Sequence, residues 1–585
     1  MLSSSVCTET LVILHMYRSI LVVLLMFCVG IRSIGQAQRY DVIIEEIMAR
    51  PNPRVGLPAN KWLELKNTSA HAINLQGWHI AWGNTRSGAM PAYIIKPDSF
   101  LIICSTLSLP VLRGSGPAIG ITLFPTLTLA GQMLSLVSND SRVIHSVNYQ
   151  DTWYKDDVKK GGGWSLEMID THNPCSGISN WKASINVRGG TPGDKNSVSA
   201  INSDHAPPQL ISAFASDSLN VTLTFNESLD STTASALINY NISDGIRVQS
   251  VRMIAPMFQR VRLKLQDAIV RNKVYLVTVT GVTDCSGNTI GTKNHARLGL
   301  SSVADSLSVV INEILFNPRP GGVDYVELYN RSGKIVNCRQ LYVANRNSGG
   351  VMSTRTQLTR DSLLLFPGDY LLLTTDPPVV LQQYVSLHPE AFLAVTSLPS
   401  FANDKGSVIL TNLQGNILDE VKYADQWHFQ LITNTQGVAL ERIDYNGPST
   451  KENFHSAATS AGYGTPGYKN SQYKPEGTVQ GSLSVDPEVF SPDNDGVDDI
   501  VSVVYTFPAP GNVANINIYD ANGRLVRYLQ KNALCGIKGV YLWDGLGDKM
   551  QKLPIGIYII LTEIFNVDGK RKQFKNTVVL ARRLN

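Results

Sequence analysis

The strongest constraint on this chain is an internal repeat, in which two long segments carry the same short motifs in the same order. Residues 41–53 read DVIIEEIMARPNP, and residues 308–320 read SVVINEILFNPRP. Further matched pairs are Trp62–Asn67 with Tyr325–Asn330, Val147–Tyr149 with Val421–Tyr423, Ser165–Asp170 with Ala439–Asp444, and Gly190–Gly193 with Gly464–Gly467. Loops tolerate the small insertions between these pairs. The chain of 585 residues has room for roughly four domains, and two of them are predicted to be copies of one module.

Inside each copy the side-chain pattern has a period of two, which is typical of β-strands. Trp62–Leu65 and Tyr325–Leu328 alternate, so each is expected to be a strand with one face in water. Phe100–Ile103 and Tyr370–Leu373 are apolar on both faces and are expected in a sandwich core. Short strands separated by turn signals predict an Ig-like β-sandwich. One short helix is expected after Asp376, which can cap it.

Charge and hydrophobicity exclude several classes of protein. There are 51 Lys and Arg against 47 Asp and Glu, a formal charge of +4, so overall charge does not make the chain a polyanion binder. With 17% charged and 43% hydrophobic residues, the chain is neither largely disordered nor a coiled coil. Beyond the N-terminus there is no apolar run of about 18 residues or more, so no later transmembrane helix is expected.

The N-terminus predicts a secretory signal peptide, residues 1–37. An apolar run, Ile20–Gly30, is too short for a comfortable membrane span, and small residues favour a cut after Ala37. Met16 is an alternative start, and a lipoprotein at Cys28 is the less favoured interpretation. The protein is therefore expected to leave the cytoplasm.

The cysteines fit an exported protein without requiring a disulfide scaffold. Two of the seven lie in the signal peptide, and the rest are scattered without a CxxC: Cys104, Cys175, Cys285, Cys338 and Cys535. Zinc sites and disulfide-rich scaffolds need denser, paired spacing. The sequence predicts buried thiols with at most one or two bridges.

Two further β modules are predicted beside the two copies. Residues 206–300 begin with a Pro-bearing joint and contain the alternating strands Val221–Phe225 and Val261–Leu265. Residues 483–585 contain a strand from Ile500 to Phe507 and a hairpin with an Asn-Gly turn. The expected architecture is thus all-β, with four tandem Ig-like sandwiches after the signal peptide.

At this point the motifs resemble known families. In the two copies, INEI, [WY][LV]EL, LE-x-ID and GTPG-x-x-NS are similar to the bacterial lamin-tail domain, although Glu45 departs from the motif where the second copy keeps Asn312. The V-x-D-x-S-G-N motif of the middle module resembles Ig-like repeats of bacterial surface-layer proteins. FSPDNDG, IYD, WDG and PIGIY resemble the Ig-like module of flagellar hook scaffolds and the related C-terminal domains that direct proteins through type IX secretion. The implied order is lamin-tail domain 1 (38–200), bacterial Ig-like domain (206–300), lamin-tail domain 2 (305–473) and a sorting-type or hook-scaffold-type domain (483–585), and the lamin-tail resemblance implies no catalytic residues.

Several groups could suggest chemistry, and each also has a structural interpretation. Asp493, Asp495 and Asp499 around Gly496 partly fit a calcium loop, but a serine, Ser502, stands where the loop needs its bidentate Glu. An Asx-rich turn is therefore the favoured interpretation, and no metal site is predicted.

The repeated glutamates, and some glycines, tryptophans and lysines, also have both a functional and a structural interpretation. Solvated or hydrogen-bonded structural carboxylates are favoured over a catalytic acid–base pair. The triple glycine is expected to be a flexible hairpin, because it lacks the strand-to-helix context of a phosphate cradle, and the tryptophans are expected in cores. Three lysines would support DNA binding if they form a basic patch. These residues are Glu46, Glu64, Glu313 and Glu327; Gly161–Gly163; Trp78, Trp153, Trp164, Trp181 and Trp427; and Lys155, Lys159 and Lys160.

The sequence therefore favours a non-enzymatic protein that is secreted or on the outer cell surface, with the periplasm as the alternative location. Its expected role is adhesive or structural in the envelope, with no catalytic residue, cofactor or metal. The alternative is an accessory protein that binds extracellular polysaccharide or DNA, and an unrecognised hydrolase ranks third. Expected partners are an extracellular polysaccharide, protein or DNA, and secretion machinery that reads the C-terminal domain.

Overall fold

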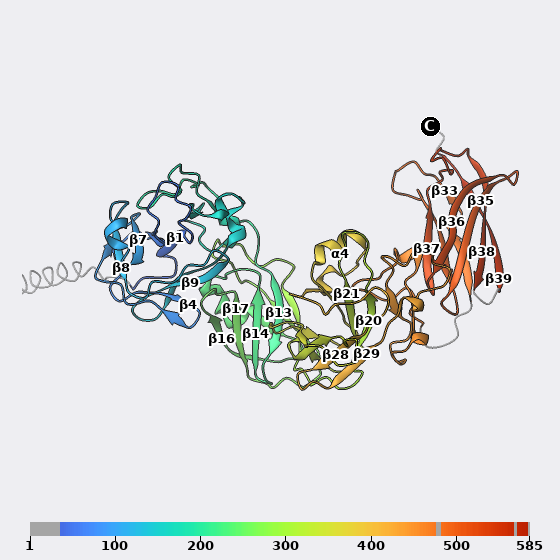
Figure 1. Ribbon diagram of the computed structural model, residues 1–585, viewed down its shortest axis with the longest axis horizontal. Coiled ribbons are helices and arrows are strands. Elements are labelled where there is room, and N and C mark those ends of the chain that lie inside the picture. The colour runs from blue at the N-terminus through green and yellow to red at the C-terminus, as the bar shows by residue number, and fades with distance from the viewer. Residues whose placement is uncertain (1–35, 475–480, 567–569, 583–585) are drawn as a thin grey trace, which may run out of the picture. The chain divides into compact units, whose positions relative to one another are not determined.

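The computed structural model describes residues 36–474, 481–566 and 570–582, and nearly all of its regular structure is β (Figure 1). These residues form ten sheets, which confirms the all-β expectation. The predicted signal peptide lies outside the described residues, except for Gln36 and Ala37. Among the described helices, none is long and apolar enough to cross a bilayer. The chain divides into two compact units: unit 1 is 1–213, 220–267 and 276–296, and unit 2 is 214–219, 268–275 and 297–585.

The first copy of the repeat packs a six-stranded sheet, ordered β12-β11-β1-β2-β7-β8, near a four-stranded sheet, ordered β10-β9-β4-β5. The strands of the larger sheet are β1 (Val42–Met48), β2 (Trp62–Asn67), β7 (Phe100–Ser105), β8 (Ala118–Ile121), β11 (Leu166–Met168) and β12 (Trp181–Ala183). Those of the smaller sheet are β4 (His79–Trp82), β5 (Thr85–Arg86), β9 (Gly131–Val137) and β10 (Val143–Gln150), while β3 (Ile73–Asn74) pairs with β6 (Ile94–Ile95). One apolar core draws on both main sheets. The four-residue helix α2 (Leu109–Leu112) follows β7.

The second copy repeats this arrangement, with a six-stranded sheet ordered β27-β26-β21-β20-β30-β31. In both copies the two strands at one edge, β7–β8 or β26–β27, run parallel. The strands of this sheet are β20 (Val309–Leu315), β21 (Tyr325–Asn330), β26 (Tyr370–Thr374), β27 (Phe392–Ala394), β30 (Leu440–Arg442) and β31 (Phe454–Ser456). A second sheet contains β23 (Leu341–Ala344), β24 (Thr356–Gln357), β28 (Val408–Asn412) and β29 (Ile417–Val421). Two further strands, β22 (Val336–Asn337) and β25 (Leu364–Leu365), pair with each other. The expected helix is α4 (Pro377–Gln383), whose first turn is capped by the Asp376 carboxylate at 3.2 Å from the Val379 amide.

One expectation about the repeated strands is wrong. Alternation predicted a wet face for Trp62–Leu65 and Tyr325–Leu328, yet the structure buries both stretches on both faces. Glu64 and Glu327 are fully buried, because the chain after β12 or β31 folds back over the sheet and covers that face. The polar residues of these alternating strands therefore lie in a buried polar layer and do not face solvent.

The middle segment, residues 206–300, forms two smaller sheets. The first is ordered β13-β14-β17-β16 and the second β15-β18-β19. Alternation predicts β17 correctly, since its burial alternates residue by residue. The elements are β13 (Leu210–Ala215), β14 (Asn220–Phe225), α3 (Ser231–Ala234), β15 (Tyr240–Ile242), β16 (Val248–Ile254), β17 (Arg260–Leu265), β18 (Tyr275–Val279) and β19 (His295–Leu298).

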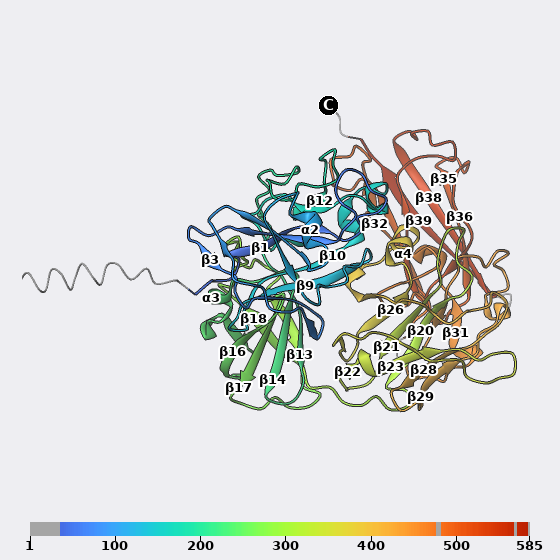
Figure 2. The ribbon, with the colours of Figure 1, turned by 60° about the vertical axis from the view of Figure 1, so that its left-hand side comes forward.

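The C-terminal segment, residues 483–585, packs a three-stranded sheet, β32-β34-β37, against a five-stranded sheet, β33-β39-β38-β35-β36. Its long strands lie side by side in both views (Figures 1 and 2). The predicted hairpin joins β35 to β36 through Gly523, whose φ of 78° suits glycine. The strands are β32 (Ser482–Asp486), β33 (Val489–Phe490), β34 (Val501–Thr506), β35 (Asn512–Asp520), β36 (Leu525–Cys535), β37 (Lys538–Trp543), β38 (Gly556–Asn566) and β39 (Arg571–Leu580).

Candidate functional site

Each copy encloses a cluster of buried glutamates on three adjacent strands. In the second copy, the β-ladder places Glu313 of β20 opposite both Glu327 of β21 and Glu441 of β30. The loop after β31 closes over them: the Thr465 hydroxyl lies 2.8 Å from oxygens of both Glu313 and Glu441, and the Gly467 amide donates to Glu327. The GTPG motif of the repeat is therefore the cover of a carboxylate cluster.

The first copy has the same cluster but one different residue. The Thr191 and Gly193 amides donate to Glu46 and Glu64 at 2.9 and 2.6 Å. In the second copy the amide of Asn312 donates to Glu327 at 2.8 Å and to Asn470 at 2.7 Å. Its counterpart is Glu45, which has no amide to donate, and one oxygen each of Glu45 and Glu64 is buried without a hydrogen-bond partner.

Burial changes the acidity of these groups. Removal from water, followed by the charge of a neighbouring glutamate, raises the pKa of Glu46 and of Glu313 to about 8. Burial also raises the pKa of Glu45, Glu64 and Glu327 well above the ordinary range. Such pKa values occur in catalytic acids, but a general acid must reach its substrate. All five carboxyls are buried, and those of Glu46, Glu64, Glu313 and Glu327 accept backbone amides, which fits the structural interpretation.

Two clusters of acidic side chains have the oxygen-rich composition that calcium prefers. Asp493, Asp495 and Asp499 bring oxygens within 4.8 Å of one another. Both oxygens of Asp499 accept backbone amides, including that of Gly496 at 2.8 Å, as in the expected Asx-rich turn. Ser502, which stands where the calcium loop needs its bidentate Glu, belongs to β34.

The second acidic cluster escaped the sequence analysis, because its residues come from three distant stretches: Asp204, Glu227 and Asp284. Burial and the two neighbouring aspartates raise the pKa of Glu227 to about 7. The Asp284 carboxylate is itself committed to the amides of Ser286 and Asn288, at 2.8 and 2.9 Å.

A disulfide ties the first copy to the middle segment within unit 1. It joins Cys175 and Cys285, which are 110 residues apart, while the thiols Cys104, Cys338 and Cys535 are buried and free. This agrees with the expected mixture of buried thiols and one or two bridges.

One arginine makes a second connection between the first copy and the middle segment within unit 1. Arg39 donates to the Leu229 carbonyl at 2.8 Å, and its guanidinium lies 4.0 Å from the centroid of the Phe258 ring. The first copy and the middle segment are thus joined both covalently and by packing.

The three lysines that would support DNA binding do not form an open basic patch. Lys160 lies 3.8 Å from Asp151 and 3.7 Å from Asp157, and Lys159 donates to a carbonyl while lying over the Trp164 ring. Only Lys155 of the three is fully exposed. This placement does not support a DNA-binding face here.

The glycines and tryptophans have structural roles. A Cβ on Gly162 would lie 1.9 Å from the carbonyl oxygen of Asn52, so the triple glycine permits close backbone packing rather than a flexible hairpin or a phosphate cradle. Trp78, Trp153 and Trp181 are buried in the core of the first copy, as expected. Trp164 and Trp427 are half-buried, and Trp427 packs on Phe454.

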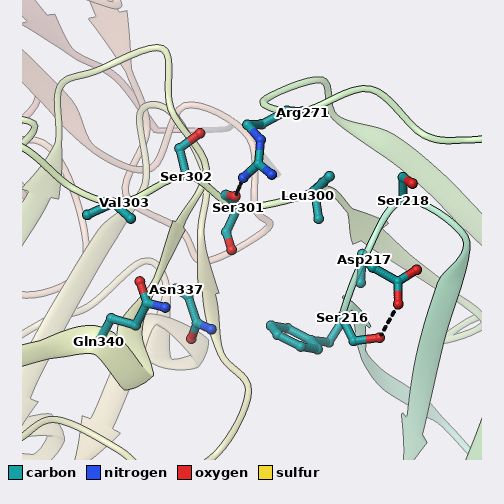
Figure 3. Close-up of a pocket in the computed structure, with 12 residues that line it drawn as sticks. Ser216, Asp217, Ser218, Arg271, Leu300, Ser301, Ser302, Val303, Asn337 and Gln340 are labelled. Carbon is teal, nitrogen blue, oxygen red and sulfur yellow. Dashed lines mark hydrogen bonds between the residues drawn. The ribbon is translucent and has the colours of Figure 1, made fainter. Parts of the chain in front are cut away.

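A pocket of about 560 Å³ lies within unit 2 (Figure 3). Figure 3 shows Asn337 and Gln340 on one side and the turn Ser216–Ser218 on the other. The linker 300–303 crosses between them and is fixed by bridges from Leu300 to Arg271 and from Ser302 to Val336. Hydroxyls, amides, one acid and one guanidinium line this pocket together with the apolar residues Phe214, Leu300 and Val303, and such a mixture of groups can bind a sugar.

Comparisons with known proteins identify one segment. Residues 185–298 match the family described as the bacterial Ig-like domain, which supports the Ig-like prediction for 206–300 and begins earlier than it. No curated protein matches the chain.

Solved structures give only remote similarities. The N-terminal part of the bacterial S-layer protein SbsC is 16% identical, with 37% of this chain and 44% of that chain covered and a TM-score of 0.16. A DUF4876 family protein from Bacteroides thetaiotaomicron is 12% identical, with 37% and 91% covered and a TM-score of 0.18. A tetra-tandem repeat from a large adhesion protein is 10% identical, with 93% and 99% covered and a TM-score of 0.13. Similarities at these TM-scores carry no argument about function.

Proposed function

We propose that this protein is exported and acts at the outer cell surface as a non-enzymatic structural or adhesive component of the envelope. In this proposal the two copies are lamin-tail domains, and the C-terminal segment presents the chain to type IX-like secretion machinery. The observation that carries the proposal is the Cys175–Cys285 disulfide. Disulfides persist in oxidising compartments outside the cytosol, and this one fastens two neighbouring modules into a fixed body, as a structural role requires.

Protease shaving of intact cells tests location and attachment together. Mass spectrometry of the released peptides should recover both copies, including the peptides linked through Cys175 and Cys285 in the absence of reductant. A chain that is protected until the outer membrane is opened would instead be periplasmic, and the surface role would then be abandoned.

A second candidate function, binding of extracellular polysaccharide, is favoured over DNA binding by the pocket in Figure 3. Its short hydroxyls and amides suit a neutral, polyhydroxylated ligand better than a row of phosphates. A glycan array probed with the full chain should give signals that Gln340→Ala weakens and Gln414→Ala, an exposed change outside the pocket, leaves intact. Equal signals from the wild type and both variants would remove this pocket from consideration.

A further inference from the structure

The second copy and the C-terminal segment, both in unit 2, meet along a well-packed junction. Phe429 of the second copy packs with Val513 and Leu534 of the C-terminal segment, and all three side chains are buried. The Leu534 amide donates to the Thr459 hydroxyl at 3.0 Å. These contacts resemble those inside a domain, so the two modules hold a fixed geometry where they touch.

The turn that leads into β37 lies especially close to the second copy. The Ile537 amide donates to the Ser471 carbonyl at 2.9 Å, and a Cβ on Gly536 would lie only 2.4 Å from that same oxygen. Ser460 and Tyr505 share a hydrogen bond of 2.8 Å across the junction. Glycine at 536 therefore allows two backbones to approach where a larger residue would separate them.

A pocket of about 420 Å³ opens between these surfaces. The second copy contributes Tyr468, Lys469 and Tyr473, and the C-terminal segment contributes Lys538 and Thr506. This volume lies within the usual range for small-ligand sites, roughly 300 to 1,000 Å³. Since both modules supply its walls, the pocket exists only while they are docked.

The pocket has a positive charge that no acidic side chain neutralises directly. Lys469 and Lys538 are exposed, and neither forms an ion pair with any carboxylate in the described ranges. The acidic groups that interact electrostatically with Tyr468 are the buried glutamates of the second copy, among them Glu313. Burial raises the pKa of Glu313 to about 8, which disfavours its charged form.

One of these lysines is held in place by an aromatic stack. The Lys469 ammonium lies 4.2 Å from the centroid of the Tyr473 ring, whose ring also stacks on Tyr445 at a centroid distance of 4.4 Å. Tyr445 in turn packs on Tyr329. A cation fixed in this way loses less freedom when it pairs with an anion, so the site is partly organised before a ligand arrives.

We propose that this junction pocket binds a carboxylate-bearing sugar residue of an acidic extracellular polysaccharide. Lys469 and Lys538 pair with the sugar carboxylate, the Tyr468 ring packs against the sugar, and the Thr506 hydroxyl meets its hydroxyls. A concave pocket of this size takes one or two sugar rings, whereas duplex DNA requires cations spread along a row of phosphates. The proposal extends the surface role, on which it depends only for access to the ligand.

Binding of polygalacturonate to the full-length protein, measured by calorimetry, tests the assignment. The matched ligand is the same polymer with its carboxylates reduced to alcohols. We expect binding to polygalacturonate that weakens as salt rises from about 50 to about 200 mM, and at least tenfold weaker binding to the reduced polymer. Each of Lys469→Gln and Lys538→Gln should weaken binding about tenfold, equivalent to about 1.4 kcal/mol.

Lys531→Gln is the matched control, because Lys531 is an exposed lysine of the same module that lies over Tyr528, outside the pocket. It should bind like the wild type, and circular dichroism should show all three variants folded. The assignment is overturned if polygalacturonate does not bind, if Lys531→Gln weakens binding as much as the pocket variants, or if duplex DNA binds more tightly with the same dependence on Lys469 and Lys538. None of these results changes the outcome of the shaving experiment, so failure here is distinct from failure of the surface role.

Discussion

The difference between the two glutamate clusters predicts that Glu45→Asn stabilises the first copy. The second copy carries Asn312 at this position, and its amide joins Glu327 to Asn470. Asn196 is the counterpart of Asn470, so an asparagine at position 45 should recreate the network with Glu64. The substitution also removes a buried carboxyl that has an unpartnered oxygen.

The magnitude follows from the carboxyl group that Glu45 buries in the first copy. In the folded state burial raises the pKa of Glu45 well above the ordinary value for a glutamate, whereas in the unfolded chain a glutamate ionises near about 4.3. One oxygen of Glu45 is also buried without a hydrogen-bond partner, which costs about 1 to 3 kcal/mol. The folded pKa is the higher one, so the wild type loses stability as pH rises above the unfolded pKa. The advantage of Glu45→Asn should therefore be about 1 to 3 kcal/mol at pH 7 and smaller at pH 4.

Urea unfolding followed by tryptophan fluorescence measures this difference in the intact protein. Six of the eight tryptophans lie in residues 38–200, so the signal reports mainly the first copy. Glu45→Gln removes the same ionisable group without the asparagine geometry and separates charge from shape. Asn312→Glu introduces the glutamate into the second copy and should destabilise it at pH 7. A Glu45→Asn midpoint equal to that of the wild type at pH 7, or a shift that does not depend on pH, would refute the reasoning.

Three further predictions concern stability. Replacing both Cys175 and Cys285 by serine should destabilise unit 1 by about 2 to 4 kcal/mol, seen as a lower melting temperature that reductant no longer changes; an unaltered melting temperature would contradict the fastening role. Burial lowers the pKa of His145 to about 4, and its Nδ1 accepts the Ile44 amide at 3.0 Å. The unfolded chain therefore binds the extra proton, and stability should fall as pH drops from about 6.5 to about 4. His145→Gln should flatten that part of the pH profile, and an unchanged slope would count against this role of His145. Arg442 is fully buried and lies 2.8 Å from Asp419, so Arg442→Ala should lower the free energy of unfolding by about 3 to 5 kcal/mol. The exposed change Arg524→Ala should lower it by under about 1 kcal/mol. Denaturant unfolding measures both variants, and equal effects would mean that Asp419 finds another partner.

Local patterns in the sequence predicted much of the fold. The period of two in Val261–Leu265 matches the alternating burial of β17, and Asp376 before two prolines located α4. Both signals depend on neighbouring residues, which one sequence displays directly. The internal repeat likewise agrees with the common strand order of the two six-stranded sheets.

Features that depend on distant segments were not visible in this way. In the acidic cluster of Asp204, Glu227 and Asp284, the last residue lies 57 positions after Glu227 in the sequence. The junction pocket takes its two lysines from different modules, Lys469 and Lys538. Neither spacing corresponds to a motif, because the folded sheets and the docking of domains bring these residues together.

The glutamates show how a correct pattern can be given the wrong environment. Alternation assigns Glu64 and Glu327 to one face of a strand and reports nothing about what covers that face. The cover is the Thr, Gly and Ser of GTPG-x-x-NS, more than a hundred residues after Glu64 or Glu327, whose amides and hydroxyls bond the carboxyl groups. The glutamates and the GTPG-x-x-NS motif recur together in both copies. This joint recurrence was the available sequence signal that the two are in contact. The motifs that define this repeat are therefore the two halves of one buried hydrogen-bond network, and Glu45 marks the point where the first copy lacks a donor.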